Sequence, residues 1–309
     1  MTASPAVSVV IPAYGHADLV EETLASVFAQ TFTDYETVVV NDGSPDRTAE
    51  VLRPYAEAGR VRYVEQANGG QAAARNRGVR EARGRYLALL DDDDLWPDDK
   101  LAWQVAALDA DPALLAVGGT VEKFDPDGRV VDAWGGPSRT LTRAELLSEG
   151  NAFTSPGQVL FRRRALEAVG GFDPAIWGAD DYDLLLRLVA RGPVAVVDRP
   201  ALRYRVHGAN ASRHTVRHFE SVVQVLRKHL REGTDAERRA AYRWAYAFRG
   251  RRIIGLAKEG VRAGEYGRAA HTLAALRHLL GPALRDARLQ REIVRDLLPA
   301  RISQAGRAD

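Results

Sequence analysis

The stretch Tyr86–Trp96, YLALLDDDDLW, joins a short apolar run to four consecutive aspartates. The run shows almost no alternation between apolar and polar residues, which is typical of a strand buried in a parallel sheet. Neighbouring carboxylates repel one another by about 1 kcal/mol per close pair even in water, so we expect a cation to compensate them. Mg²⁺ and Mn²⁺ prefer such oxygen ligands. A solvated acidic loop that caps the next helix is the alternative, and for an isolated acidic run it is the commoner outcome.

The residues on either side of this stretch predict an α/β fold. Apolar or β-rich runs alternate with amphipathic segments: strands are expected at 7–11, 36–40, 61–65 and 86–90, and helices at 18–29, 46–58 and 71–82. This rhythm indicates a largely parallel sheet whose ligands bind beyond the carboxyl ends of the strands. Between 113 and 164 shorter extended segments surround the reverse turn Asp125–Gly128, so the sheet is expected to become mixed there. A helix at 180–190 and strands at 194–197 and 202–206 complete this part.

Composition divides the 309 residues into two parts. Up to Arg213 the chain has 31 acidic and 23 basic residues, whereas beyond it there are 10 acidic and 20 basic ones. Strand patterns stop near 214, so we predict a first domain over 1–213 and a basic, all-helical region over 214–309. The chain has no cysteine, which excludes disulfides, thiolate metal ligands and a cysteine nucleophile, and fits a reducing compartment. The start lacks a basic segment, so no signal peptide is expected.

Two further motifs follow predicted strands. Asp42 and Gly43 close the run VVVN, and an acidic residue there can accept hydrogen bonds from a ribose or a nucleobase, although an ordinary Asp-Gly turn is the alternative. The sequence NGGQAAARN at 68–76 places two glycines at a helix start, where N–H groups meet phosphate. Arg75 would add a fork of donors, and a helix cap with a surface arginine is the alternative.

The third pair of motifs lies downstream. If a helix begins near Asp180, Asp181 shares a face with Leu185 and Leu188, so its carboxylate points toward the protein body, as suits a catalytic base. Asp180 can instead be read as a helix cap. The segment YRVHGANAS at 204–212 contains His207, for which a structural role and a catalytic role are about equally expected.

Taken together, these motifs resemble the family 2 inverting glycosyltransferases, which have the GT-A fold. The resemblance runs from Val7 to Ser212 and rests on VSVVIPAYG, VVVNDGS, NGGQAAARNRG, LLDDDDLW, GGFD with ADDYDLLLR, and YRVHGANAS. LLDDDDLW corresponds to the family's DXD signature, which we align as Asp91-x-Asp93. Gly15 stands where the family usually has Asn. The region after Ser212 is not covered by the resemblance.

The resemblance implies a transferase that moves a sugar from a nucleoside diphosphate sugar to an acceptor hydroxyl with inversion, using Mn²⁺ or Mg²⁺. Asp181 would be the catalytic base, and Asp93 and His207 would hold the metal. Residues implied to bind the nucleotide sugar are Pro12, Tyr14, Asp42, Arg75, Asp91 and Asp92. Trp96, Trp177 and Asp180 are candidate acceptor or sugar contacts, although for the two tryptophans core packing is equally expected. The implied process is biosynthesis of a polysaccharide, cell-surface glycan or glycoconjugate.

Other functions fit the residues less well. A nicotinamide or flavin enzyme would need G-x-G-x-x-G after the first strand, where this chain has Pro12-Ala13-Tyr14-Gly15. A sugar nucleotidyltransferase would need a glycine-rich, basic first turn. A non-catalytic nucleotide-sugar or glycan-binding homologue is the alternative that stays open. The acceptor is expected to be a glycan, a lipid-linked or a small molecule, and nucleic acid is not expected. A cytoplasmic location is expected. The basic tail would allow peripheral contact with anionic lipid at the inner face of the membrane, and a solvated or subunit-facing bundle is the slightly favoured alternative.

Overall fold

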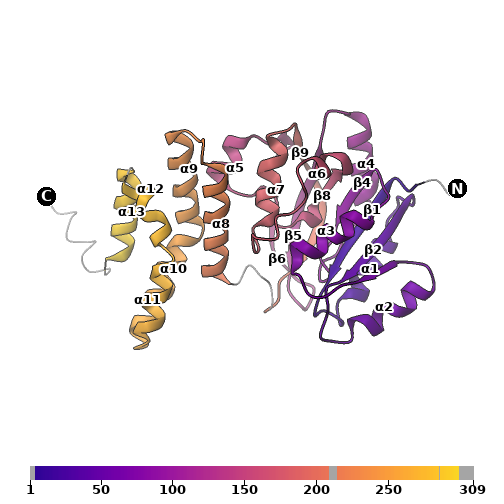
Figure 1. The fold of residues 1–309 in the computed structure, drawn as a ribbon, viewed down its shortest axis with the longest axis horizontal. Helices are drawn as coiled ribbons and strands as arrows, with labels where there is room; N and C mark the ends of the chain where they lie inside the picture. The colour runs from indigo at the N-terminus through magenta and orange to yellow at the C-terminus, as the bar shows by residue number, and fades with distance from the viewer. Residues whose placement is uncertain (1–3, 209–213, 285, 299–309) are drawn as a thin grey trace. The chain divides into compact units, whose positions relative to one another are not determined.

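The fold is described from a computed structural model, which covers residues 4–208, 214–284 and 286–298. The elements alternate as expected up to β4 and become purely helical after β9 (Figure 1). The strands are β1 Val7–Ala13, β2 Tyr35–Asn41, β3 Arg62–Glu65, β4 Tyr86–Leu89, β5 Ala116–Phe124, β6 Val130–Trp134, β7 Arg139–Thr140, β8 Val159–Arg162 and β9 Val194–Arg205. The helices are α1 Val20–Phe28, α2 Thr48–Glu57, α3 Gln71–Glu81, α4 Lys100–Ala110, α5 Arg143–Glu149, α6 Arg163–Ala168, α7 Asp180–Val189, α8 Thr215–His229, α9 Asp235–Ala245, α10 Arg251–Arg262, α11 Tyr266–Ala274, α12 Arg277–Leu284 and α13 Ala287–Leu297.

One mixed sheet organises the first part of the chain. Its order is β3-β2-β1-β4-β8-β5-β9-β7, with β6 paired to β5. The strands β3, β2, β1 and β4 are parallel, and β8 runs antiparallel to both β4 and β5. The prediction of a parallel sheet that becomes mixed beyond residue 113 is therefore confirmed. The expected turn at Asp125–Gly128 joins β5 to β6, and the N–H of Gly128 donates to the carbonyl of Asp125 at 2.9 Å.

Two strand boundaries differ from the sequence-based expectation. β1 continues through Pro12 to Ala13, because the β1–β4 ladder already ends at Val10 and the missing N–H of proline breaks no bond in it. The two short strands expected at 194–197 and 202–206 form the single strand β9, whose pairing with β5 shifts register between Gly118 and Val121. The polar turn-forming residues at 198–200 lie in β9 at this shift in register, so they do not end the strand.

Helices cover both faces of the sheet. Val9 and Ile11 of β1 pack with Leu24 of α1 and Leu101 of α4 in the large core cluster. The alternate residues of the strands face α3, where Val38 and Val40 contact Ala74. α3 approaches β1 so closely that a Cβ on Gly78 would lie 2.1 Å from Val10 Cγ1. These two layers leave the ends of the strands as the surfaces where functional side chains gather.

The described chain divides into two compact units. The first contains the sheet, and the second consists of 214–284 and 286–298 with the segments Ala144–Gly150 and Ile176–Tyr182. The domain boundary expected at 213 falls outside the described residues. In the second unit the apolar face of α8 is buried, including Val222, Val223 and Leu226, as the sequence periodicity predicts. No helix among residues 4–208, 214–284 and 286–298 has both the length and the apolar character needed to cross a membrane.

Candidate functional site

Three loops meet at the carboxyl ends of the parallel strands. They follow β1 at Tyr14–His16, β2 at Asp42–Ser44 and β4 at Leu90–Asp94. β1 lies between β2 and β4 in register, so the three loops are neighbours in space. Gly15 has a φ of +76° with no neighbouring atom near its Cβ direction. Glycine and asparagine both tolerate that backbone region, which explains why glycine can stand at this position. We call the surface formed by these three loops the donor edge.

The four aspartates have four different environments, beginning with Asp91. Its Oδ1 accepts from Arg75 Nη2 at 2.7 Å and from Gln71 Nε2 at 3.1 Å, and its Oδ2 accepts from Ser155 Oγ at 3.2 Å. The guanidinium of Arg75 is buried against the sheet. The structure thus brings together Arg75 and Asp91, two residues that the sequence predicts to bind the nucleotide sugar.

Asp92 is buried and holds the loop after β1. Its Oδ2 accepts from the backbone N–H of Tyr14 at 2.8 Å, and its Oδ1 lies 2.8 Å from Nδ1 of His16. The hydrogen bond to Asp92 raises the pKa of His16 to about 9, and burial raises the pKa of Asp92 to about 6. At pH values between these two pKa values the residues form an ion pair in the metal-free protein, and a metal ion at the other ring nitrogen of His16 would replace its proton. Tyr14 is anchored through its backbone, while its side chain is 47% exposed at the donor edge.

Asp93 is the aspartate nearest to a set of metal-ligand atoms. Its Oδ2 lies 2.8 Å from Nε2 of His207, the residue that the family resemblance pairs with it as a metal ligand. One ligand atom from each of His16, Asp93 and His207 lies within 4.8 Å of the others. The rings of the two histidines meet edge to face with centroids 5.4 Å apart. Two imidazoles and one carboxylate can hold a divalent transition-metal ion, whereas Mg²⁺ prefers oxygen ligands alone.

Asp94 has a structural role. It is fully buried, its Oδ1 accepts from the backbone N–H of Arg205 at 2.9 Å, and its own carbonyl accepts from Thr23 Oγ1. Burial raises the pKa of Asp94 well above its usual range, and the charges of Asp93 and Asp91 add to the effect. The fourth aspartate therefore fastens the acidic loop to β9, and the first three face the donor edge.

Asp42 organises the glycine turn before α3. Its Oδ1 accepts from Gln66 Nε2 at 2.7 Å and from the N–H of Gly69 at 2.9 Å, and its Oδ2 accepts from the N–H of Gly70 at 2.9 Å. Both carboxylate oxygens are thus engaged by the protein. The two predicted motifs, the Asp-Gly turn and the NGGQ turn, are joined into one structure by this carboxylate.

Asp180 and Asp181 start α7, as the sequence predicts, and belong to the second unit. Asp180 is buried, whereas Asp181 is half-buried and its Oδ1 accepts from the N–H of Tyr182 at 2.7 Å. The side-chain hydroxyl of Tyr182 donates to the carbonyl of Leu146 at 2.7 Å, which fixes the first turn of α7 within that unit. Asp181 is therefore partly accessible rather than directed wholly into the protein body.

The two tryptophans that are candidate sugar contacts, Trp96 and Trp177, differ in how far they are exposed. Trp96 is only 3% exposed, Nζ of Lys100 lies 4.1 Å from its ring centroid, and its indole N–H donates to the carbonyl of Gly157 at 2.9 Å. A covered ring cannot stack on a sugar, so the core-packing alternative holds for Trp96. Trp177 is half-buried, and within the second unit the guanidinium of Arg217 lies 4.0 Å from its ring centroid.

Sequence reasoning missed His16 and Ser155. His16 directly follows the turn after β1, at the same sheet edge as the aspartates, and a histidine in that position is a signal that the sequence does contain. Ser155 lies in a loop before β8, and its contact with Asp91 depends on the antiparallel pairing of β8 with β4. The second half of the predicted YRVHGANAS motif, 209–212, lies outside the described residues.

Comparisons with solved structures agree on the fold. The Staphylococcus aureus protein TarS, residues 1–349, in complex with UDP-GlcNAc superposes with a TM-score of 0.64 at 16% identity over 88% of this chain and 91% of that one. The mannosyltransferase PcManGT from Pyrobaculum calidifontis, in complex with GDP-Man and Mn²⁺, gives 0.57 at 23% identity over 93% and 88% of the two chains. The sheet and its flanking helices are thus a GT-A fold.

Sequence comparisons identify the family. A chondroitin synthase of Escherichia coli and a hyaluronan synthase of Pasteurella multocida are each 33% identical over 213 residues, or 67% of this chain. The matched region covers only 30% of the length of the chondroitin synthase and 21% of the length of the hyaluronan synthase. The family model "Glycosyl transferase family 2" matches residues 8–170, which include all three loops of the donor edge. The chain therefore belongs to glycosyl transferase family 2.

Proposed function

We propose that this chain is a glycosyltransferase that uses a divalent metal to transfer a sugar, with inversion, from a nucleoside diphosphate sugar to an acceptor hydroxyl. The observation that carries the proposal is the cluster of His16, Asp93 and His207 at the donor edge, next to the Arg75–Asp91 pair. A structural acidic loop would not need two histidines facing its carboxylates.

The residues present fit a metal ion. His16 uses Nδ1 to contact the carboxylate of Asp92, which leaves its other ring nitrogen for a metal, and such a carboxylate behind a ligating histidine fixes the ring and strengthens the ligand. Nε2 of His207 and Oδ2 of Asp93 would supply the other two donors. A divalent ion bound there would neutralise charge on the departing diphosphate.

Around that cluster we assign the nucleotide sugar to the donor edge. Arg75 and Asp91 would meet the nucleoside, and the turn anchored by Asp42 would present backbone groups to it. Pro12 and Tyr14 would line the same side, because β1 leads directly into it. The proteins solved with UDP-GlcNAc and GDP-Man share this fold, which supports a nucleoside diphosphate sugar as the donor class.

We assign the role of catalytic base to Asp181. Its carboxylate would accept the proton of the acceptor hydroxyl as that oxygen attacks the anomeric carbon, while the bond from that carbon to the diphosphate breaks. The partial exposure of Asp181 at the start of α7 supports a group that can receive a proton from a ligand. Asp180 and Trp177, which flank it in the sequence, are candidate acceptor contacts.

We infer that the acceptor is a growing polysaccharide or a related glycan, because the sequence relatives at 33% identity are named as synthases of two polysaccharides. Predicted contact of the basic tail with the inner face of the membrane belongs to the same proposal. Val294 and Leu297 of α13 are exposed beside Arg295, as an interfacial helix requires. Sedimentation with anionic vesicles tests this part: the intact chain should bind, and Val294→Ser with Leu297→Ser should weaken binding.

The catalytic proposal is tested by a panel of nucleotide sugars assayed for transfer and hydrolysis with Mn²⁺ or Mg²⁺. With the nucleotide sugar that wild type turns over, Asp93→Ala and Asp181→Asn should each lose most of the wild-type turnover. Asp98→Asn is the matched control, because Asp98 is an exposed carboxylate after the same loop. If Asp93→Ala and Asp181→Asn both kept wild-type turnover, the proposed roles would be wrong. Donor binding with no turnover in the wild type would favour the non-catalytic homologue instead.

A further inference from the structure

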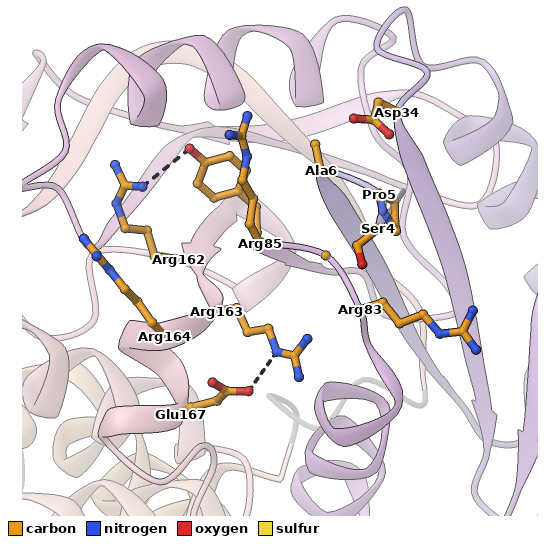
Figure 2. A pocket seen from close by; sticks show the side chains of 12 residues that line it. Ser4, Pro5, Ala6, Asp34, Arg83, Arg85, Arg162, Arg163, Arg164 and Glu167 are labelled. Atoms are coloured by element: carbon orange, nitrogen blue, oxygen red, sulfur yellow. Dashed lines mark hydrogen bonds and ion pairs between the residues drawn. The ribbon is translucent and has the colours of Figure 1, made fainter. Parts of the chain in front are cut away.

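A second pocket lies at the opposite edge of the same sheet. Its volume is about 640 Å³, and it is lined by the residues before β1 and β4 and by the junction of β8 with α6 (Figure 2). Because β1 and β4 begin here and end at the donor edge, the length of β1, about 20 Å, separates the two places. The pocket is therefore distinct from the proposed donor site.

Arginines dominate the lining of this pocket. Figure 2 shows them on two segments of the chain, one just before β4 and the other at the junction of β8 with α6. The charged residues of the lining are Arg83, Arg85, Arg162, Arg163, Arg164, Asp34 and Glu167. Five cationic groups therefore face two carboxylates, so the pocket attracts anions.

Arg162 belongs to the framework of the pocket. Its guanidinium donates to the carbonyls of Leu108, Asp111 and Leu114 around the end of α4, and it lies 3.5 Å from the hydroxyl of Tyr86. These contacts hold it in place, so its charge is fixed at the wall of the pocket. A fixed cation is pre-organised for an anion but has few hydrogen-bond donors left to offer.

The other arginines are available to a ligand. Arg163 pairs with Glu167 at 2.7 Å and Arg85 with Asp109 at 3.2 Å, and ion pairs between such solvent-accessible side chains are weak. Arg83 and Arg164 are exposed and have no carboxylate partner within the part of the chain that the structure describes. In Figure 2 they lie on either side of Arg163 with their guanidinium groups directed away from it, so both side chains would change rotamer to reach a ligand beside Arg163.

We propose that this arginine pocket is a second, phosphate-binding site that takes a diphosphate or a similarly charged phosphate group. Guanidinium groups match phosphate oxygens with pairs of parallel donors, and the volume suits a small phosphorylated ligand. The phosphate can belong to a molecule in solution or to a lipid headgroup, and both present the same oxygens to Arg83, Arg163 and Arg164.

The test uses inorganic pyrophosphate on the full chain without divalent metal, because the donor edge then has no bound cation to attract the anion. Calorimetric titration should show binding to wild type that weakens as NaCl is raised. The variant Arg83→Gln with Arg164→Gln should lose about tenfold or more in affinity. The variant Arg53→Gln with Arg129→Gln removes the same charge from exposed sites elsewhere and should bind as wild type does.

Two further arms complete the test. Asp93→Asn should keep pyrophosphate binding, since it changes only the donor edge. If pyrophosphate fails to bind wild type, the next assay is sedimentation with vesicles that contain phosphatidic acid. Wild type and the control variant should sediment with them, and the Arg83/Arg164 variant should bind about tenfold less well. That result assigns the phosphate to a lipid. The proposal is overturned if the Arg83/Arg164 variant equals wild type in both assays, or if Asp93→Asn is the variant that loses binding.

Discussion

The two ends of strands β1 and β4 carry charges of opposite sign. The negative charges are buried and paired, whereas the positive charges are mostly exposed. At the donor edge Asp92, Asp93 and Asp94 are nearly or fully buried and each has a partner inside the protein. At the arginine pocket the cations Arg83 and Arg164 are exposed and lack a carboxylate partner within 4–208, 214–284 and 286–298. The charged groups of the donor edge are therefore held by contacts within the protein, whereas Arg83 and Arg164 remain accessible to a ligand.

This difference has energetic consequences. A charge that is buried and hydrogen-bonded costs several kcal/mol when its partner is removed, whereas an exposed charge costs little. Substitutions at the donor edge should consequently change chemistry or stability strongly, and substitutions in the arginine pocket should change only ligand binding. The predictions below test that contrast.

The largest effect is expected for Asp93→Asn. Asparagine keeps one oxygen for the contact with His207 but loses the negative charge, so turnover should fall by about a hundredfold or more. Initial rates of nucleotide release with saturating Mn²⁺ measure this. Arg83→Gln with Arg164→Gln should keep the wild-type rate, and equal losses in the two variants would erase the distinction between the edges.

His16→Ala should weaken Mn²⁺ binding by about 10- to 100-fold, because it removes one donor of the cluster and exposes the carboxylate of Asp92. A Mn²⁺ titration followed by calorimetry reports the change. His271→Ala, which alters an exposed histidine of α11, is the control. Unchanged Mn²⁺ affinity in His16→Ala would show that His16 serves only to hold Asp92 and the loop after β1.

Lys100 is a buried ionisable residue outside both the donor edge and the arginine pocket. Its side chain is fully buried, Nζ donates to Oε1 of Gln104 at 2.7 Å, and burial lowers the pKa of Lys100 well below its usual value. Between that lowered pKa and about 10.4 the unfolded lysine holds a proton that the folded one lacks, so the free energy of unfolding should rise with pH by up to about 1.4 kcal/mol per unit.

Urea unfolding at pH 7.5 and 9.5 detects this rise, and Lys100→Met should reduce it. Lys123→Met is the control, because Lys123 lies at the surface and pairs with Asp132 at 2.9 Å. A pH dependence that is the same in wild type and Lys100→Met would mean that the amine keeps its proton in the core.

The smallest effect is expected on the free energy of unfolding when exposed arginines of the pocket are replaced. Arg83→Gln with Arg164→Gln should change the free energy of unfolding by less than about 0.5 kcal/mol, as is usual for surface substitutions. Arg162→Gln should be clearly more destabilising, because three backbone carbonyls would lose their donor. Equal stabilities of the two variants would contradict the division into framework and available arginines.

Much of the donor edge was predictable from local patterns. Non-alternating apolar runs located β1, β2 and β4, and parallel strands place the residues that follow them at one edge, so Asp42, Asp91 and Asp93 were expected together. The pairing of Asp93 with His207 was expected only through the family resemblance, because the two residues are 114 positions apart. Trp96 could not be assigned, since an amphipathic ring serves equally well in a core or at a sugar site.

The sequence by itself determined the fold class, the family and the position of the acidic loop, because these depend on periodicity and on residues close together in the chain. Only the tertiary structure decided which aspartate does what: burial and distant partners assign Asp92 to His16, Asp93 to His207 and Asp94 to the backbone of Arg205. The arginine pocket likewise exists only because the pairing of β4 with β8 brings Arg83 and Arg85 beside Arg162–Arg164. Identical neighbours along a chain become different once the sheet gives each its own surroundings.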